Sequence, residues 1–444
     1  MSDLDHDVEA WVRSAPRRDL LPPRRAESAP GGRPTEPLDI LRFEDRGALV
    51  VADIERGYLV VPVAPGTPAR RAAPGDGVAV AMLGAMRPGG VEGAFRAAGF
   101  GARDDELPAI GRETESAIDV DQSNDSVNVG DAAVVKLFPL VSGGPQPGVD
   151  LPVHLHAVGF TALPAPMGAI WWTSPAGEDV LLATASAFLP GARDGWEWYL
   201  DLVLGWLDGA VGDAASFEPA RETGRIAAHM HAAFATASHV VPEPLARADD
   251  ATATGWHRAA LEVADDALAC TDGKEGARLA ERADEIRAEL DVLGSARGAP
   301  MTHVHGDFHV GQVLQWADGY AVTDFDGDPT AAPADRGALD TPVRDVAAFV
   351  RSIDHLGRVA STRRPGHDDA IERWIAASRA AFLDAYVHEL QGAGHVHLFD
   401  ERLLRPLEVM QECHEYVYAA RFLPRWRLVP DLALRAMFPR GEER

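Results

Sequence analysis

The pattern of hydrophobic residues along this chain changes near residue 190. Before that point, short runs of β-branched and aromatic residues alternate with turn signals such as Asp45-Arg46-Gly47, which is typical of strands. After it, apolar residues recur at the spacing of amphipathic helices, and only the segment 312–323 again resembles a β-hairpin. A β-rich first part and a helical second part with one embedded hairpin predict an α+β, bilobal fold.

The same patterns predict individual elements and three domains. We expect a β-meander over 38–65 that continues to about residue 90, and a short helix over 91–100. Further strands are expected at 117–121, 126–130, 132–138, 166–173 and 179–188, with a helical or irregular stretch at 149–158. Helices are expected at 196–211, 217–239, 251–270, 275–293, 342–356, 366–391 and 399–421. The predicted domains are a β-rich cap (1–90), a sheet-containing N-lobe (91–190) and a helical C-lobe (191–444).

The embedded hairpin carries the most specific motif, HGDFHVGQVLQWADGYAVTDFDGDP, at residues 305–329. A hairpin brings its two ends together, here Asp307 and Gln312 at one end and Asp324 at the other. An amide oxygen from Gln312 and a carboxylate from Asp324 suit a hard cation such as Mg²⁺. Asp307 is placed to accept a proton from a hydroxyl substrate. This spacing is typical of the catalytic loop of protein kinases, whereas a lone HGD would favour a surface hairpin with acidic turns.

Phosphoryl transfer also needs a lysine and a loop for the nucleotide phosphates. Lys136 is one of only two lysines among 42 basic residues, and it lies in the apolar run AAVVKLF, which predicts a strand. Because arginine stands at almost every other basic position, a retained lysine indicates a site that requires a compact ammonium group. The alternative is an edge-strand lysine whose ammonium group reaches solvent. Upstream, the polar turn 121–126 offers Ser123, Asn124 and Ser126 to phosphate oxygens.

A lysine in such a site usually needs an acidic partner, and Asp150 in GVDLPVHL is the candidate. The loop residues around Asp150 are the alternatives. Pro152 argues against a well-formed helix directly after this position.

Composition excludes some classes of partner. The formal net charge of -26 argues against nucleic acid and anionic membranes, which need a positive field. Cys270 and Cys413 lie far apart and form no CxxC motif, so neither a disulfide framework nor a zinc site is indicated. The acidic start MSDLDHDVEA has the wrong sign for a signal peptide. We therefore expect a cytoplasmic monomer whose partner is a small molecule.

Taken together, the motifs resemble bacterial maltokinases, in the aminoglycoside-phosphotransferase-like branch of the eukaryotic-like kinases. The resemblance rests on HGDFHVGQVL and DFDGDP, on DTPVRDVAAFVRSIDH (340–355), and on DQSNDSV with VVKLF (121–138) and FLPGARDGWEW (188–198). TGRIAAHMHAAFA (223–235) resembles the family's helix with a buried histidine, and EYVYAARFLPRW (415–426) resembles its C-terminal helix. The resemblance implies a eukaryotic protein kinase-like fold.

The resemblance also implies roles for individual residues. Asp307 is the catalytic base, Gln312 and Asp324 ligate Mg²⁺, and Asp326 assists a second metal or the substrate. The implied contacts to ATP come from Ser123, Asn124, Ser126, Lys136 with its acid Asp150, and the adenine-binding backbone at Phe188 and Leu189. The implied contacts to the acceptor substrate come from Asp307, His309, Arg344, Gln411, Glu412 and Glu415. Within the same motif, Asp318 belongs to the turn and Asp328 is structural.

The helix expected at 407–421 departs from the maltokinase pattern. Glu408, Gln411, Glu412 and Glu415 lie at i, i+3, i+4 and i+7, so they share one helix face. Like charges stacked in this way destabilise a helix unless a cation compensates them. The stripe is either an exposed acidic face or the wall of an acceptor site that binds an ammonium group. The second interpretation favours an amino sugar, and the chain resembles actinobacterial glucosamine kinases in this respect.

We therefore expect an ATP- and Mg²⁺-dependent kinase that transfers the γ-phosphate to a sugar hydroxyl, with the 6-hydroxyl of D-glucosamine as the favoured acceptor. Three alternatives stay open. They are maltokinase activity that yields maltose 1-phosphate, phosphorylation of aminoglycosides, and nucleotide binding without catalysis.

Overall fold

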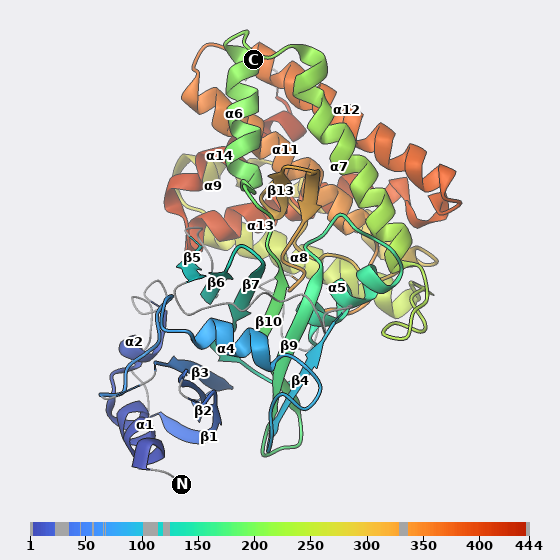
Figure 1. The fold of residues 1–444 in the computed structure, drawn as a ribbon. Coiled ribbons are helices and arrows are strands. Elements are labelled where there is room, and N and C mark those ends of the chain that lie inside the picture. Colours follow the sequence, from blue (N-terminus) through green and yellow to red (C-terminus); the bar gives the residue numbers. More distant parts are fainter. Residues whose placement is uncertain are drawn as a thin grey trace. The chain divides into compact units, whose positions relative to one another are not determined.

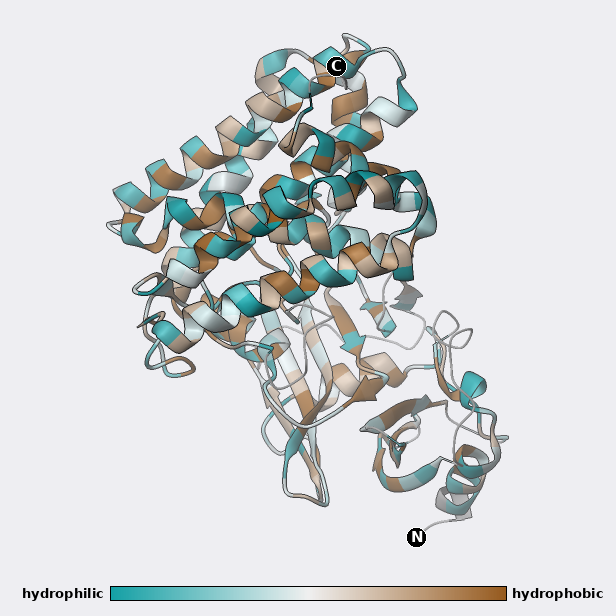
Figure 2. Ribbon diagram, turned by 180° about the vertical axis from the view of Figure 1, so that it is seen from behind, coloured by the Kyte–Doolittle hydropathy of each residue, from teal (hydrophilic) through white to brown (hydrophobic). Residues whose placement is uncertain are grey.

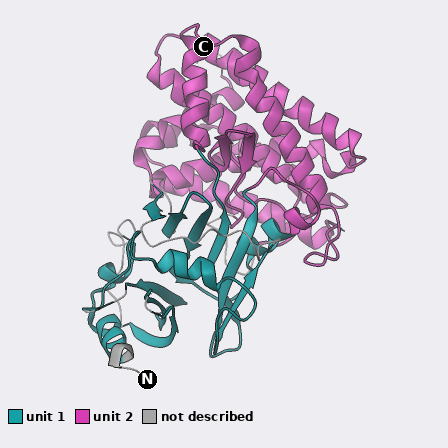
Figure 3. Cartoon of the chain, viewed as in Figure 1, with its two compact units in different colours: residues 1–153, 164–190, 332–335 teal, residues 154–163, 191–331, 336–444 magenta. Residues whose placement is uncertain are grey.

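A computed structural model of the chain describes residues 3–22, 35–44, 46–55, 57–64, 66, 68–100, 114–118, 125–327 and 336–440. The chain divides into two compact units (Figure 3). Unit 1 is built mainly from Met1–Val153 and Pro164–Pro190, and unit 2 is built from His154–Leu163, Gly191–Ala331 and Arg336–Arg444. Strands dominate unit 1 and helices dominate unit 2, so the division follows the change of pattern in the sequence (Figure 1).

Unit 1 contains a four-stranded antiparallel sheet in the order β1-β2-β3-β8. Its strands are β1 (Glu36–Arg42), β2 (Ala48–Asp53), β3 (Tyr58–Val63) and β8 (Leu140–Val141). Pairing of β1 with β2 and of β2 with β3 confirms the expected meander. Helices α1 (Asp3–Ser14) and α2 (Arg17–Leu20) cover one face of this sheet through Val12 and Leu20. Figure 2 shows its strands largely in the brown of hydrophobic residues, because both faces are covered.

The second sheet of unit 1 has six antiparallel strands in the order β4-β9-β10-β7-β6-β5. They are β4 (Phe95–Gly99), β5 (Glu115–Ala117), β6 (Asp125–Val129), β7 (Ala133–Leu137), β9 (Pro166–Thr173) and β10 (Asp179–Ala187). The strands expected at 126–130, 132–138, 166–173 and 179–188 are confirmed. Of the strand expected at 117–121, β5 includes Ala117, and residues 119–121 lie outside the described residues.

Two predictions for the region between the sheets are wrong. The short helix expected over 91–100 is the strand β4, which pairs with β9 and places Phe95 and Ala97 against the core. The strands expected to continue to residue 90 are replaced by helix α4 (Val78–Ala85). Both sheets and α4 share one hydrophobic core, so α4 is apolar on all sides, as expected for a helix buried on all sides. The boundary expected at residue 90 therefore falls inside one compact unit.

Helix α5 (Pro147–Ala157) contradicts the expectation that Pro152 prevents a regular helix after Asp150. A proline inside a helix removes one backbone hydrogen bond. Here Val149, Leu151 and Leu155 are all at most 5% exposed, and burying these side chains offsets the loss.

Unit 2 is helical, as expected, and most of its helices show alternating teal and brown residues in Figure 2, the mark of amphipathic helices. The helices are α6 (Gly195–Leu207), α7 (Asp213–Phe234), α8 (Asp250–Cys270), α9 (Gly273–Glu281), α10 (Ala283–Leu290), α11 (Val343–Arg363), α12 (Asp368–Gly392), α13 (Leu404–Arg421) and α14 (Leu428–Met437). The single helix expected at 275–293 is divided at Arg282, whose buried side chain turns inward to donate to the carbonyl of Phe438. Among the described residues, no helix is long and apolar enough to cross a membrane.

Two small sheets complete unit 2. The expected hairpin is confirmed as β13 (Val313–Trp316) and β14 (Gly319–Val322). The two strands pair from Val313 opposite Val322 to Trp316 opposite Gly319. The other sheet pairs β11 (Ala246–Arg247) with β12 (Pro300–Met301). The protein therefore has the α+β organisation expected of a protein kinase-like fold, with the hairpin motif inside the helical unit.

Candidate active site

The hairpin brings together the polar residues that its sequence suggested. The N–H of Thr323 donates to the carbonyl of Gln312 over 3.0 Å, so the residue before Asp324 is fixed beside Gln312. The Nε2 atom of Gln312 lies 3.5 Å from Oδ2 of Asp307. The Asp307 side chain is 36% exposed and Asp324 is also accessible, so both carboxylates can be reached from solvent. Asp324 adopts a φ of 65°, a left-handed conformation that suits a turn directly after a strand.

A buried aspartate anchors the backbone immediately before Asp307. Asp345 on α11 is 1% exposed, and its carboxylate accepts from the N–H of His305 (2.7 Å) and the N–H of Gly306 (3.0 Å). His231 on α7 contacts the same carboxylate over 3.1 Å, and the hydroxyl of Tyr386 on α12 lies 2.7 Å from the other ring nitrogen of His231. Burial raises the pKa of Asp345, but His231 and His305 outweigh burial and hold this pKa below its usual value. Asp345 is therefore an anion that ties the loop to three helices.

His305 closes this loop from the other side. Its Nε2 atom lies 2.9 Å from the carbonyl of Thr323, and its ring contacts that of Phe325 at 4.7 Å. His305 is fully buried, so it braces the loop from inside unit 2. Asp307 is thus presented from a loop held at its base by Asp345 and at the hairpin by His305.

Helix α6 packs so closely against the same loop that two contact positions have no room for a Cβ atom. Asp194 caps the helix by accepting from the N–H of Trp196 over 2.8 Å. A Cβ atom at Gly195 would lie 1.7 Å from the carbonyl oxygen of Val310. A Cβ atom at Gly311 would lie 2.8 Å from the ring of Trp196. Glycine at both positions lets α6 and the loop lie in backbone contact.

Aromatic rings and polar groups gather around His309, two residues after Asp307. The Trp196 ring lies 6.4 Å from the His309 ring, and the Trp426 ring lies 5.8 Å from the Trp196 ring. The Nε1 of Trp426 donates to Glu415 over 3.2 Å, and Nε2 of Gln411 donates to the same carboxylate over 3.4 Å. Burial lowers the pKa of His309 below its usual value, although the nearby Glu415 carboxylate opposes this. His309 is therefore neutral at neutral pH. Its Nδ1 atom accepts from the N–H of Gly311 over 3.0 Å, so the ring proton lies on Nε2, which can donate a hydrogen bond. We refer to His309, Trp196, Gln411, Glu415 and Trp426 as the acceptor cluster.

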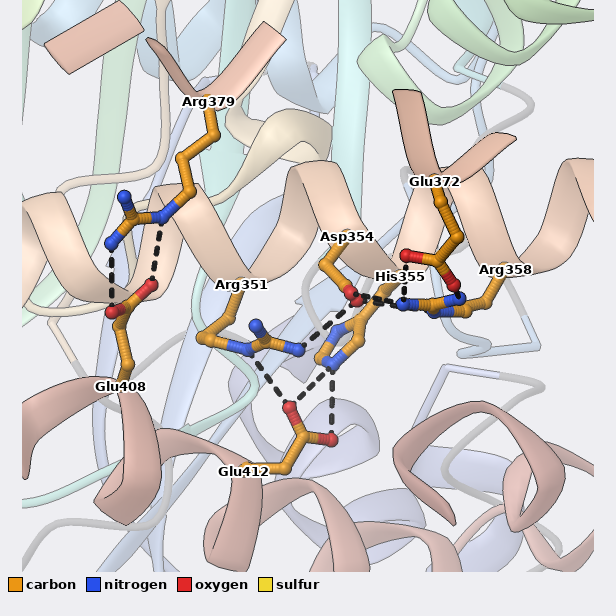
Figure 4. Close-up of polar contacts among 8 residues, drawn as sticks. All are labelled: Arg351, Asp354, His355, Arg358, Glu372, Arg379, Glu408 and Glu412. Carbon is orange, nitrogen blue, oxygen red and sulfur yellow. Dashed lines mark hydrogen bonds and ion pairs between the residues drawn. The ribbon is translucent and has the colours of Figure 1, made fainter. Parts of the chain in front are cut away.

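The rest of the acidic stripe on α13 is buried, so it is not an exposed acidic face. Glu408 and Glu412 are 3% and 0% exposed. Glu412 accepts from Nε of Arg351 (2.9 Å) and from Nε2 of His355 (3.1 Å), as Figure 4 shows. Glu408 accepts from Nη2 of Arg379 over 3.0 Å. Arginines of α11 and α12 therefore compensate both charges, and the burial of Glu412 argues against the substrate contact expected for it.

The buried charges continue along α11 (Figure 4). Asp354 lies 3.3 Å from Arg351 and 3.2 Å from Arg358, and Arg358 also pairs with Glu372 on α12. Burial lowers the pKa of His355, but Glu412 and Glu415 outweigh burial and raise the pKa above its usual value. The network joins α11, α12 and α13, and it borders the acceptor cluster, because the His355 ring lies 6.3 Å from the Trp426 ring.

Arg344, expected to contact the substrate, forms an ion pair within its own helix region in this structure. Its Nε donates to Asp340 over 2.6 Å, four residues earlier. Its Nη1 lies 3.6 Å from the sulfur of Met410. Arg344 is one quarter exposed, so any substrate contact would be added to this ion pair.

In unit 1, Lys136, Ser126 and helix α5 lie on one face of the six-stranded sheet. Lys136 on β7 stands directly opposite Ser126 on β6 and Thr184 on β10. Since β7 lies between two other strands, Lys136 is not an edge-strand lysine. Thr184 stands opposite Ala169, which packs against Val149 of α5. Lys136 and α5, whose first turn carries Asp150, therefore share one face of the sheet.

The remaining expected contacts to the nucleotide are only partly described. The N–H of Phe188 donates to the carbonyl of Ala132 over 3.1 Å, which ties the end of β10 to the turn before β7. Phe188 and Leu189 are half-buried. Ser123 and Asn124 lie outside the described residues, as does Asp328.

The fit of Mg²⁺ can be judged from the donors at the hairpin ends. Gln312 and Asp324 offer an amide and a carboxylate oxygen, and magnesium commonly takes one or two protein oxygens together with substrate phosphates and water. Among the described residues, no group of three or more His, Cys, Asp or Glu side chains could hold a metal alone. The donor set therefore fits a magnesium ion that arrives with a nucleotide.

Sequence reasoning missed several residues of this site. Asp345 was not singled out, although it lies at helical spacing with Phe349 and Ile353 on an apolar face of α11, where a carboxylate needs a reason. The buried histidine implied for the helix at 223–235 is His231, which is fully buried. Trp426 carried no local signal, because its role depends on a contact with Glu415 across the turn after α13.

Comparisons with known proteins agree with this geometry. No family model matches the chain. A glucosamine kinase from Streptacidiphilus jiangxiensis is 41% identical over 380 residues, which cover 83% of this chain and 83% of the relative. A glucosamine kinase from Mycolicibacterium smegmatis is 36% identical over 376 residues, which cover 84% of this chain and 90% of the relative.

Solved structures give the same result. A crystal form of glucosamine kinase superposes with a TM-score of 0.83 at 35% identity, over 97% of this chain and 99% of the other. A glucosamine kinase in complex with glucosamine, ADP and inorganic phosphate superposes with a TM-score of 0.80 at 36% identity, again over 97% and 99%. Sequence identity above 30% over most of both chains, together with this likeness of fold, shows that the chain belongs to the glucosamine kinase family.

Proposed function

We propose that this protein is a kinase that transfers the γ-phosphate of ATP to a hydroxyl of D-glucosamine, with the 6-hydroxyl as the expected acceptor. The observation that carries the proposal is the acceptor cluster, where one accessible carboxylate, Glu415, stands among tryptophans and a neutral histidine. Two relatives that bear the name glucosamine kinase, and a related structure that contains glucosamine and ADP, support the same substrates.

The proposed chemistry begins at Asp307. Its carboxylate accepts a hydrogen bond from the attacking hydroxyl and takes its proton as the bond to phosphorus forms. The loop that carries Asp307 is fixed by Asp345 and His305, so the carboxylate is positioned before the substrate arrives. Nε2 of neutral His309 lies 3.9 Å from Asp307 and would donate a second hydrogen bond to an oxygen of the sugar.

The metal ion and the nucleotide phosphates are each assigned to their own set of residues. Gln312 and Asp324 would hold Mg²⁺, which when bound neutralises charge on the phosphate oxygens. Lys136 would bind the phosphates from its face of the sheet, with Ser126 as its direct neighbour. Asp150 would orient Lys136 from the first turn of α5.

Recognition of the amino group is assigned to Glu415. Its carboxylate already accepts from Trp426 and Gln411, and a third, charged donor adds an interaction that a neutral sugar lacks. Trp196 and Trp426 offer apolar ring faces to the C–H groups of a sugar. This combination favours an amino monosaccharide over maltose.

The test compares phosphorylation of glucosamine, glucose, N-acetylglucosamine, maltose and an aminoglycoside, with the position of the phosphate read by NMR. We expect glucosamine to give the highest kcat/KM and Asp307→Asn to lower kcat by about 100-fold or more. Asp318→Asn, in the exposed turn of the same hairpin, is the matched control and should retain activity. Turnover of maltose or of the aminoglycoside in preference to glucosamine would contradict the substrate assignment, and full activity of Asp307→Asn would contradict the assigned base.

A further inference from the structure

The part of unit 1 expected to be a cap contacts both β5 and β6, and β6 begins with Asp125 and Ser126, the described residues of the predicted phosphate-binding turn (121–126). The two strands pair only from Glu115 opposite Val129 to Ala117 opposite Val127, and β5 is a three-residue edge strand. So short a pairing needs further contacts to hold its position.

The first of these contacts is an ion pair with β6. Arg71 forms an ion pair with Asp125, the first residue of β6, and their side chains are only 17% and 21% exposed. Arg71 is itself held by a β-bridge to Val63 at the end of β3. The next residue after Asp125 is Ser126, which stands opposite Lys136. The ion pair therefore connects the four-stranded sheet to the lysine strand.

The second contact is a set of hydrogen bonds to β5. The carboxylate of Glu115 accepts from the N–H groups of Gly75 (2.8 Å), Gly77 (2.9 Å) and Val80 (2.9 Å), around the start of α4. Glu115 is 8% exposed, so these hydrogen bonds are largely shielded from water. A carboxylate at a helix N-terminus also interacts favourably with the helix dipole.

Both contacts come from one short segment, residues 71–80, and they hold the paired strands β5 and β6. A group that binds phosphates contributes most when it is already held in its bound position, because ordering it on binding costs conformational entropy. Contacts that fix β6 keep Ser126 opposite Lys136 before the nucleotide binds.

We propose that Arg71 and the start of α4 are positioning elements for nucleotide binding, because they hold β6, with Ser126, beside Lys136 on β7. The proposal rests on the proposed kinase function. Arg71 and Glu115 touch no substrate and act through Asp125 and through α4.

The test is titration of ADP, without sugar, into Arg71→Ala, Arg71→Lys and Asp125→Asn. We expect Arg71→Ala to weaken ADP binding about tenfold, and Arg71→Lys to recover part of the loss because it keeps the charge. In the double variant Arg71→Ala/Asp125→Asn the losses should not add, since both changes break one contact. Arg70→Ala is the matched control, because Arg70, the residue directly before this segment, pairs with Asp76 and is more exposed than Arg71.

Steady-state kinetics separate positioning from general stability. We expect Arg71→Ala to raise KM for ATP while KM for glucosamine stays within about twofold of the wild type. Unchanged ADP affinity in folded Arg71→Ala, or equal losses in Arg70→Ala, would overturn the inference. A wild type that binds ADP but does not phosphorylate glucosamine would instead overturn the proposed function, and the ADP titrations would still decide the role of Arg71.

Discussion

Glu412 and Glu415 lie three residues apart on α13, yet they differ in burial and in the groups that donate hydrogen bonds to them. Glu412 is fully buried between Arg351 and His355, whereas Glu415 is accessible and held by neutral donors. We therefore predict that Glu412→Gln lowers stability with little effect on the KM for glucosamine of the folded protein. Glu415→Gln should raise that KM with little effect on stability.

The magnitudes follow from the contacts. Glu412→Gln removes the charge that compensates Arg351, whose side chain is only 8% exposed. Breaking a buried ion pair costs about 3–5 kcal/mol, and Asp354 at 3.3 Å from Arg351 keeps the cost near the lower value. For a helical unit of this size, about 3 kcal/mol lowers Tm by about 6–12 °C. Glu415→Gln removes the charged hydrogen bond that we propose to the substrate, worth about 1.5–3 kcal/mol, which corresponds to a KM about 10- to 150-fold higher.

The assay measures both variants by thermal unfolding and by steady-state kinetics with glucosamine at a temperature where each is folded. Glucose serves as a neutral acceptor, because Glu415→Gln should reduce the preference for glucosamine over glucose. Two results would refute this reasoning. One is a Glu412→Gln protein of wild-type Tm, and the other is a Glu415→Gln protein that keeps the wild-type preference for glucosamine.

Three further predictions concern the supports of the site. Gly195→Ala should lower Tm and kcat together, because its Cβ would lie 1.7 Å from the carbonyl oxygen of Val310; overpacking of this kind costs about 1–3 kcal/mol or more, and an unchanged melting curve would contradict it. Asp345→Asn should lower kcat by about 100-fold with a smaller change in KM, since a small displacement of the catalytic carboxylate is enough for such a loss, and rapid-quench measurement of the chemical step checks this. The raised pKa of His355 stabilises the folded state fully below about pH 6.5, and this contribution is lost as pH rises through the folded pKa; urea unfolding from pH 6 to 9 should show a fall in stability that His355→Gln abolishes.

The sequence predicted those elements whose signals are local. The hairpin β13–β14 and the strand around Lys136 are defined by short patterns of apolar residues and turns, and both lie where expected. The region 78–99 was misread because its structure depends on distant partners. Strand β4 exists because it pairs with β9, and α4 is helical inside a core supplied by two sheets.

The same distinction applies to the candidate site. Asp307, Gln312 and Asp324 could be named because their spacing along the chain reflects one hairpin. The burial and ion pairing of Glu412 could not be predicted in this way, because they depend on Arg351, which lies 61 residues away in sequence. Helical spacing placed the carboxylates of α13 on one face but could not show which of them an arginine already compensates.

Because Arg351 already compensates the charge of Glu412, the proposed recognition of an amino group is assigned to Glu415 alone. An ammonium group bound at Glu412 would compete with Arg351 and His355, and an arginine left without its carboxylate in a buried site is costly. Glu415 presents no such conflict, because its hydrogen-bond donors, Trp426 and Gln411, are neutral. Its negative charge is therefore available to a cationic substrate. The stripe of acidic residues thus divides into two parts: Glu412 fixes α13 against α11, and Glu415, one turn later, is the residue that we propose distinguishes an amino sugar from a neutral one.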